Sequence, residues 1–135
     1  MTYKEALDYI SIGSLPGSVP GLERISMLTR ALGSPETRLR FVHVAGTNGK
    51  GSTSSMLASV FRCAGYRTGL YTSPHLRRVN ERMSVCGESI GDDAFAALIS
   101  RVAAAHDSIG RPCTEFELLT AAALLFFYES GCEVC

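Results

Sequence analysis

A short glycine-rich stretch constrains the fold of this chain more than any other feature. It reads His43-Val-Ala-Gly-Thr-Asn-Gly-Lys-Gly-Ser-Thr53. The β-branched and aromatic run 41–45 before it predicts a buried strand, and 52–64 after it predicts a helix that ends at Gly65. Residues 68–72 predict a second strand. Strand, loop, helix and strand at this spacing indicate a βαβ unit, so we expect an α/β fold with a parallel sheet.

The chemistry of the loop favours phosphate binding. Gly46, Gly49 and Gly51 lack a Cβ atom, so the backbone can turn tightly and approach a ligand closely. The helix that follows directs unpaired N–H groups and its positive dipole end at the same place. Lys50 adds a positive charge, and Ser52 offers a hydroxyl where a phosphate-bound Mg²⁺ would sit. The alternative is a tight turn with a solvent-exposed lysine, and the combination of groups favours the phosphate cradle.

Local signals predict the other elements. Thr2 with Glu5, and Thr114 with Glu117, have the spacing of capping boxes, which open helices. Within 52–64, five apolar residues recur on one helical face: Met56, Leu57, Val60, Phe61 and Ala64. The full set of expected elements is helices at 2–10, 22–32, 52–64, 92–106 and 114–129, a hairpin around 87–88, and loops at 14–21 and 73–82.

Composition limits the class of protein. The 135 residues are enough for one modest domain, and 46% hydrophobic against 19% charged residues argues against disorder. Thirteen basic and thirteen acidic residues cancel, whereas a nucleic-acid-binding protein needs surplus cations. No apolar run reaches the roughly 18 residues of a membrane span, and the N-terminus is not a secretory signal. We expect a cytoplasmic protein with no membrane and no nucleic-acid partner.

The five cysteines are predicted to be reduced thiols, because no export signal precedes them. Cys132 and Cys135 form a C-x-x-C pair. A zinc site needs four ligands, and no second pair lies nearby. The sequence therefore favours a buried strand that carries two thiols over metal or redox use of the pair.

Several separate motifs resemble one protein family. The segment GTNGKGS at 46–52 is similar to the ATP loop of the Mur-ligase superfamily. YTSPHL at 71–76, NER at 80–82 and TEFELLTAAA at 114–123 then resemble folylpolyglutamate synthase, which is often bifunctional with dihydrofolate synthase. The segment 21–24 fits as well. The resemblance implies that 1–135 is the N-terminal portion of a Mur-ligase-like ATP-binding domain, with a P-loop-type parallel sheet and flanking helices.

The resemblance implies an ATP-dependent acid–amino-acid ligase. ATP would phosphorylate a carboxylate on tetrahydrofolate or dihydropteroate, and the amine of glutamate would attack the acyl phosphate and release phosphate. Such chemistry requires charge neutralisation at the transferring phosphoryl group and close placement of the reactants. The expected cofactors are ATP and Mg²⁺, and the expected partners are folate, glutamate and ATP.

The resemblance also implies roles for single residues. Lys50 would act in catalysis, and Ser73 would bind Mg²⁺. Without the resemblance, Ser73 belongs to a plain Ser-Pro turn, and Glu117 only caps its own helix. The residues expected to bind the ATP phosphates are Asn48, Gly49, Lys50, Gly51 and Ser52, and those expected to contact the folate are Gly21, Leu22, Arg82, Phe116 and Glu117.

Parts of the family pattern are not present in this sequence. A glutamate that binds Mg²⁺, a metal-binding histidine, a carbamylated lysine and a C-terminal domain are all missing, and Glu133 comes too early to be that glutamate. We therefore expect a fragment that is inactive alone and poorly soluble or partly molten. Two alternatives stay open: a truncated, non-catalytic nucleotide-binding module, and a Mur-type ligase that adds an amino acid to a peptidoglycan precursor.

Overall fold

The computed structural model describes residues 1–12 and 20–135, which divide into two compact units. The first unit contains Met1–Thr37 and Asp92–Phe126, and the second contains Arg38–Gly91 and Phe127–Cys135. Most of the loop predicted at 14–21 lies outside the described residues.

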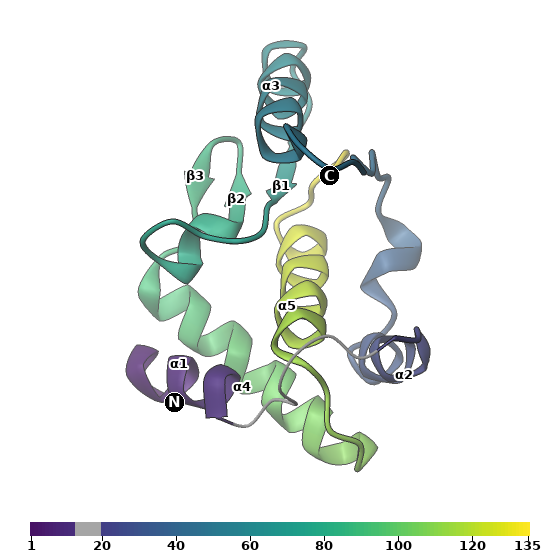
Figure 1. Ribbon diagram of the computed structural model, residues 1–135, viewed down its shortest axis with the longest axis vertical. Coiled ribbons are helices and arrows are strands. Elements are labelled where there is room, and N and C mark those ends of the chain that lie inside the picture. Colours follow the sequence, from purple (N-terminus) through teal and green to yellow (C-terminus); the bar gives the residue numbers. More distant parts are fainter. Residues whose placement is uncertain (13–19) are drawn as a thin grey trace. The chain divides into compact units, whose positions relative to one another are not determined.

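The first unit is helical (Figure 1). Its helices α1 (Tyr3–Ile12) and α2 (Glu23–Ala31) both contact α4 (Asp92–Ile109). Helix α5 (Glu115–Glu129) supplies its residues as far as Phe126, and a 3₁₀ turn, η1 (Pro35–Arg38), follows α2. The core consists of large apolar side chains that are almost completely buried: Leu28, Phe95, Ile99, Val102, Leu118 and Leu119.

Both predicted capping boxes in this unit are confirmed. The N–H of Thr2 donates to Glu5 Oε2 at 2.6 Å, and the N–H of Glu5 donates to Thr2 Oγ1 at 3.3 Å. The N–H of Thr114 donates to Glu117 Oε2 at 2.8 Å, and the N–H of Glu117 donates to Thr114 Oγ1 at 3.2 Å. Each pair satisfies donors at a helix start that have no partner inside the helix.

The second unit combines a helix with a small sheet. Helix α3 (Lys50–Cys63) is followed by β1 (Gly69–Tyr71), the 3₁₀ turn η2 (Val79–Arg82), β2 (Met83–Val85) and β3 (Glu88–Ser89). The strands lie in the order β1-β2-β3, and both pairings are antiparallel. The predicted hairpin is confirmed, and its turn has left-handed backbone at Cys86 (φ 52°) and Gly87 (φ 89°).

The predicted parallel sheet is not confirmed. Residues 41–45 were expected to form a strand, and in the structure they do not. The described pairing of this segment joins Val42 N–H to Cys135 O at 2.9 Å and Cys135 N–H to Arg40 O at 2.8 Å. The one other parallel contact among the described residues is an isolated bridge between Thr68 and Val134. A β-strand requires a continuous ladder of backbone hydrogen bonds, and the two bonds between 40–42 and Cys135 do not form one.

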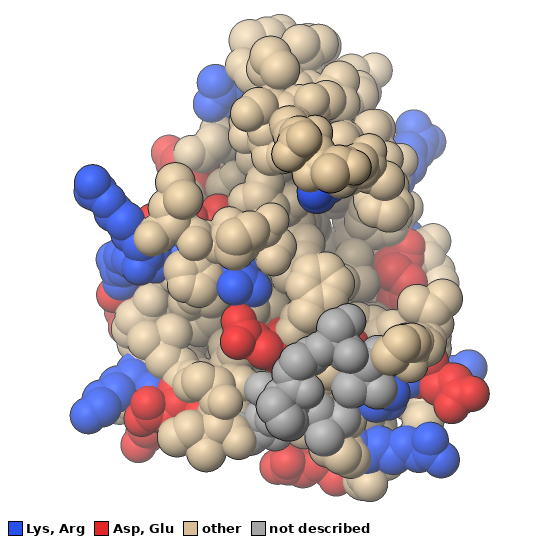
Figure 2. All heavy atoms as spheres, viewed as in Figure 1, with Lys and Arg blue, Asp and Glu red and all other residues tan. Residues whose placement is uncertain are grey.

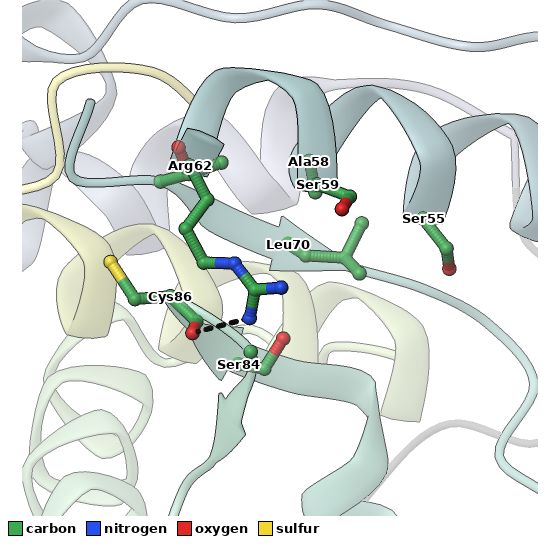
Figure 3. Close-up of a pocket in the computed structure, with 9 residues that line it drawn as sticks. Ser55, Ala58, Ser59, Arg62, Leu70, Ser84 and Cys86 are labelled. Carbon is green, nitrogen blue, oxygen red and sulfur yellow. Dashed lines mark hydrogen bonds between the residues drawn. The ribbon is translucent and has the colours of Figure 1, made fainter. Parts of the chain in front are cut away.

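The apolar face of α3 is not buried in the structure. Met56 and Val60 are 62% and 63% exposed, and none of the residues of α3 is buried. The face that lies over the sheet is polar instead, and it lines a cavity of about 240 Å³ (Figure 3) with Ser55, Ala58, Ser59 and Arg62. Arg62 Nη1 donates to the carbonyl of Cys86 at 3.1 Å, which holds this face toward the hairpin. The apolar periodicity of the sequence marks one face of α3, but it does not show which face packs against the sheet.

Surface charge is mixed. Blue and red spheres are both scattered over the visible face in Figure 2, whereas the spheres over α3, at the top of the view, are almost all tan. Among the described residues, no helix is both long and apolar enough to cross a membrane.

Candidate phosphate-binding site

The glycine-rich loop ends directly at the start of α3. Gly49 has left-handed backbone (φ 73°), a conformation that favours glycine, and the N–H of Thr53 makes the first helical bond, to Gly49 O at 2.9 Å. The N–H groups of Lys50, Gly51 and Ser52 therefore have no partner inside the helix. Residues 45–52 are all exposed, so an anion can approach these N–H groups.

The start of α3 differs from the other helix starts in its charge. The first turns of α1, α2, α4 and α5 each contain at least one acidic residue, and the first turn of α3 contains none. No side chain caps α3 either. A carboxylate at a helix start neutralises the positive dipole end, so α3 keeps a positive end that a phosphate group can occupy.

Lys50 brings a full positive charge to the same place. Its Nζ donates to Gly46 O at 2.7 Å and reaches Thr47 O at 3.4 Å. The side chain thus folds back over the loop and closes it. Asn48 lies between these carbonyls and Gly49 and is exposed, as is Ser52. The structure therefore brings together the five residues expected to bind ATP phosphates.

The polar loop after β1 is ordered by one carboxylate. Glu81 accepts backbone N–H bonds from Leu76, Arg77 and Arg78 at 3.0, 3.3 and 3.1 Å. These bonds, led by that from Leu76, hold the pKa of Glu81 below its ordinary value, with His75 adding a smaller effect.

Two predicted residues lie at the ends of this loop. Ser73 is exposed directly after β1, and Arg82 is buried. Arg82 Nε donates to His75 Nδ1 at 2.9 Å. Because Nδ1 accepts this bond, a neutral His75 ring carries its proton on Nε2. The contact fixes the direction of both side chains.

The residues predicted to contact folate lie mainly in the first unit, where an ion pair joins their two segments. Arg24 on α2 binds Glu117 on α5 twice, Nη2 to Oε1 at 3.1 Å and Nε to Oε2 at 3.2 Å. Gly21 and Leu22 come just before α2, and Phe116 precedes Glu117. Two separate stretches of sequence therefore meet in this unit.

Two exposed apolar side chains come close in sequence to this ion pair, beside the exposed charges of Glu23 and Arg111. Leu22 is 76% exposed and Phe116 is 55% exposed, while Gly21 has left-handed backbone (φ 114°). Glu117 itself is buried. Burial alone would raise the pKa of Glu117, but the bonds from Thr114 and Arg24 outweigh it, and the pKa is lowered. Glu117 is thus a charged, fully engaged carboxylate beside two exposed apolar side chains.

The described residues include no cluster of three or more His, Cys, Asp or Glu side chains that could hold a metal ion. The two residues predicted to help bind Mg²⁺, Ser52 and Ser73, are both exposed and offer hydroxyl oxygens. Mg²⁺ prefers oxygen ligands and commonly shares them between protein and substrate phosphates. The donor set therefore fits Mg²⁺ only when phosphate oxygens complete it.

Comparison with known proteins identifies relatives of the whole chain. No family model matches it. The chain is 42% identical over 132 residues to the dihydrofolate synthase/folylpolyglutamate synthase of Bacillus subtilis (strain 168), a match that covers 94% of this chain and 30% of that protein.

Solved structures agree. Folylpolyglutamate synthetase from Lactobacillus casei superposes with a TM-score of 0.92 at 38% identity, covering 99% of this chain and 35% of that one. An FPGS–AMPPCP–folate complex superposes with a TM-score of 0.93 at 37% identity, covering 99% and 34%.

These matches show that the chain has an α/β fold similar to that of part of the folylpolyglutamate synthases. More particularly, the chain is similar over most of its length to the folylpolyglutamate synthases and dihydrofolate synthases that its motifs resemble. The chain spans about a third of the length of the relatives that it matches.

Sequence reasoning missed two features of these sites. Arg24 lies within the matched segment 21–24, but nothing local connects it to Glu117, which is 93 residues away. The contact between His75 and Arg82 spans only seven residues, yet the loop between them has no periodic pattern that would predict it. Neither contact had a signal that sequence alone could provide.

Proposed function

We propose that this chain forms the phosphate-binding part of an ATP-dependent ligase that adds glutamate to folate. The observation that carries the proposal is the start of α3, where unpaired N–H groups, an uncompensated helix dipole and Lys50 converge on an exposed loop. The similarity to a protein solved with AMPPCP and folate supports both the nucleotide and the folate.

In this proposal the loop neutralises charge on the ATP phosphates. The N–H groups of Lys50, Gly51 and Ser52 and the Lys50 ammonium bind phosphate oxygens, and they are already in place before the phosphoryl group moves. Asn48 and Gly49 shape the turn. Mg²⁺, when bound with the help of Ser52 and Ser73, would supply further charge neutralisation on the same oxygens.

The folate is proposed to bind next to the ion pair between Arg24 and Glu117. Leu22 and Phe116 offer exposed apolar surface for a flat aromatic ring, and the charge of Glu117, which Thr114 and Arg24 hold in place, favours a ring whose N–H groups face it. Gly21 allows close approach. The folate contact expected for Arg82, which lies in the second unit, stays a prediction from the sequence. Transfer to a folate carboxylate would give an acyl phosphate, which the glutamate amine attacks. A cytoplasmic location remains a prediction from the sequence.

Calorimetry with AMPPCP tests the phosphate site. Lys50→Ala should weaken binding at least about tenfold, because one charge-assisted contact is worth about 1.5–3 kcal/mol. Lys4→Ala is the matched control, since Lys4 is the other lysine of the chain and lies exposed on α1. If Lys50→Ala binds AMPPCP as tightly as Lys4→Ala does, the phosphate role of Lys50 is wrong.

Fluorescence titration with dihydropteroate and with tetrahydrofolate tests the folate site. Phe116→Ala should weaken binding by about three- to tenfold, as expected for the loss of one ring contact. Ile12→Ala, which removes another exposed apolar side chain of the same unit, should have no effect. A chain that binds a UDP-linked peptidoglycan precursor and neither pterin would support the other Mur-type ligase instead.

A further inference from the structure

The cavity beside α3 has no part in the proposed function. It lies within the second unit, between one face of α3 and the hairpin sheet, and its volume is about 240 Å³ (Figure 3). Pockets for drug-sized ligands begin at about 300 Å³, so this cavity suits a smaller molecule. Among the described residues that line it, none is acidic and Arg62 alone is charged.

Helical periodicity assembles one wall of the cavity. Ser55, Ser59 and Arg62 are spaced by four and three residues, so they lie on one face of α3. Serines in other helices bond their own backbone: Ser11 and Ser100 each donate to the carbonyl oxygen four residues earlier, at 2.7 and 2.8 Å. Ser55 and Ser59 make no such bond to the described residues. Their hydroxyls therefore stay available to a ligand.

Strand periodicity assembles the opposite wall. Leu70 of β1 pairs with Ser84 of β2, so both side chains lie on one face of the sheet. Thr68 and Cys86 extend this face, and Cys86 N–H donates to Thr68 O at 2.8 Å. Ser84 is 8% exposed, and its hydroxyl has no partner among the described residues. Figure 3 shows this hydroxyl directed toward α3 and Arg62. A buried hydroxyl without a protein partner indicates that a ligand or water completes its bonds.

The guanidinium of Arg62 is held in place but only partly used. Its Nη1 donates to Cys86 O at 3.1 Å. Gly87 permits this approach, because a Cβ atom at that position would collide with Nη1. The other N–H donors of the guanidinium have no partner among the described residues, and no carboxylate of those residues pairs with it. Arg62 thus brings an uncompensated positive charge to the cavity.

We propose that this cavity binds a small oxyanion, a phosphate or a carboxylate, between Arg62 and the hydroxyls of Ser59 and Ser84. The planar guanidinium presents paired N–H donors that match the oxygens of both anions. The two hydroxyls donate to the remaining oxygens, and Leu70 faces any apolar part of the ligand. This site is separate from the start of α3, where Lys50 lies.

Titration of the isotopically labelled full chain tests the inference. The ligands are inorganic phosphate and malonate, a small dicarboxylate. At least one of them should shift the side-chain Nε–H resonance of Arg62 and the amide resonances of 84–87 along one saturating curve. The anion with the lower dissociation constant identifies the preferred class. Malonamide, the neutral analogue of malonate, should leave the same resonances unchanged.

Variants locate the anion, with the amides of 84–87 as the readout. Arg62→Gln should weaken binding at least about tenfold, and Ser84→Ala about three- to tenfold. Arg77→Gln removes the same charge from an exposed residue of the same unit and should change binding less than about twofold. Lys50→Ala should also leave binding in the cavity unchanged. The cavity site and the proposed function can therefore fail separately.

Chemical modification gives an independent measurement. Phenylglyoxal, which reacts with accessible guanidinium groups, should modify Arg62 at least about threefold more slowly when the anion is present above twice its dissociation constant. Arg77 should keep its rate, and mass spectrometry of proteolytic peptides measures both. The inference is overturned if neither anion shifts the Arg62 resonance, if Arg62→Gln binds the anion as tightly as Arg77→Gln, or if the anion does not protect Arg62.

Discussion

At the scale of single residues, Glu117 combines several roles in one carboxylate. It accepts bonds from the N–H and the hydroxyl of Thr114, at 2.8 and 3.0 Å, and a two-point contact from Arg24. An amide at this position would keep the shape and lose the charge that Arg24 requires. The residue therefore stabilises the first unit whether or not it also contacts a folate.

Glu117→Gln should destabilise the first unit by about 1–3 kcal/mol, because it replaces the charge-assisted contact between Glu117 and the half-buried Arg24 by neutral hydrogen bonds. Chemical denaturation monitored by circular dichroism measures this loss. Glu88→Gln, at the exposed strand β3, is the matched control and should change stability by less than about 0.5 kcal/mol. An equal effect of the two substitutions would contradict the role of the ion pair.

The same carboxylate predicts a pH dependence. Its pKa lies below the ordinary value of 4.5 in the folded chain, so its contribution to stability is complete above 4.5 and is lost as the pH falls through the lowered pKa. Denaturation at a series of acidic pH values should show a steeper loss for the wild type than for Glu117→Gln. Parallel curves for the two proteins would contradict this assignment.

At the scale of secondary structure elements, α3 lacks stabilising groups at its start, and the positive end of its dipole is therefore not neutralised. Its first turn has no acidic residue and no side-chain cap, unlike the capped starts of α1 and α5. A carboxylate there would stabilise the helix and compete with phosphate. Stability and nucleotide binding should therefore respond in opposite directions to one substitution.

Ser52→Asp should stabilise α3 by about 0.5 kcal/mol through its dipole and weaken AMPPCP binding at least about tenfold through charge repulsion. Thermal unfolding and calorimetry measure the two effects. Ser55→Asp places the same charge one turn further along the helix and should change both quantities less. A Ser52→Asp variant that binds AMPPCP as well as the wild type would argue that phosphate does not dock at this helix start.

Helix starts and turns that depend on residues within one short segment could be predicted from the sequence. The distant segments with which these elements pair or pack could not. The Thr2–Glu5 and Thr114–Glu117 boxes act over three residues, and the turn at Gly87 requires a residue that tolerates left-handed backbone, so each signal lies within one short segment. The strand expected at 41–45 depends on neighbours elsewhere in the chain, and its described bonds join it to Cys135. Non-local pairing of this kind has no local signature.

In the glycine-rich loop, too, local features could be predicted from the sequence and packing could not. Its glycines, Lys50 and the following helix were all visible in the sequence, and the structure places them together. The packed face of α3 was not predictable, because periodicity marks Met56 and Val60 as an apolar stripe without saying which surface covers it. In the structure that stripe is exposed, and the serine face lies over the sheet.

At the scale of the whole molecule, the chain exposes several large apolar side chains. Met56 and Val60 on α3, and Phe41 and Val42 before the glycine-rich loop, are among the exposed large side chains. Contiguous apolar surface promotes association in water. We therefore expect the isolated 135-residue chain to bind hydrophobic dyes and to unfold over a broad range of temperature.

The double substitution Met56→Gln with Val60→Thr should reduce dye binding and self-association, and change stability by less than about 0.5 kcal/mol, because exposed side chains contribute little packing. Leu28→Ala, in the core of the first unit, should instead cost about 2–5 kcal/mol. Dye fluorescence, sedimentation and calorimetry give these values. A sharp cooperative transition of monomeric wild-type chain would contradict the expectation of a partly molten state.

Glu81 accepts hydrogen bonds from three successive backbone N–H groups, and this affects where the chain can bind a free anion. Among the described residues, backbone amides converge in the loop at 76–78 and at the start of α3, and the first of these already holds the carboxylate of Glu81. A free anion would have to displace the Glu81 carboxylate from the amides of 76–78. At the start of α3 it would displace only the contacts of Lys50 to the carbonyl oxygens of Gly46 and Thr47. Inorganic phosphate added to the chain should therefore bind at the start of α3 and not at the loop 76–78. It should shift the amide resonances of residues 50–52 and leave those of 76–78 unchanged.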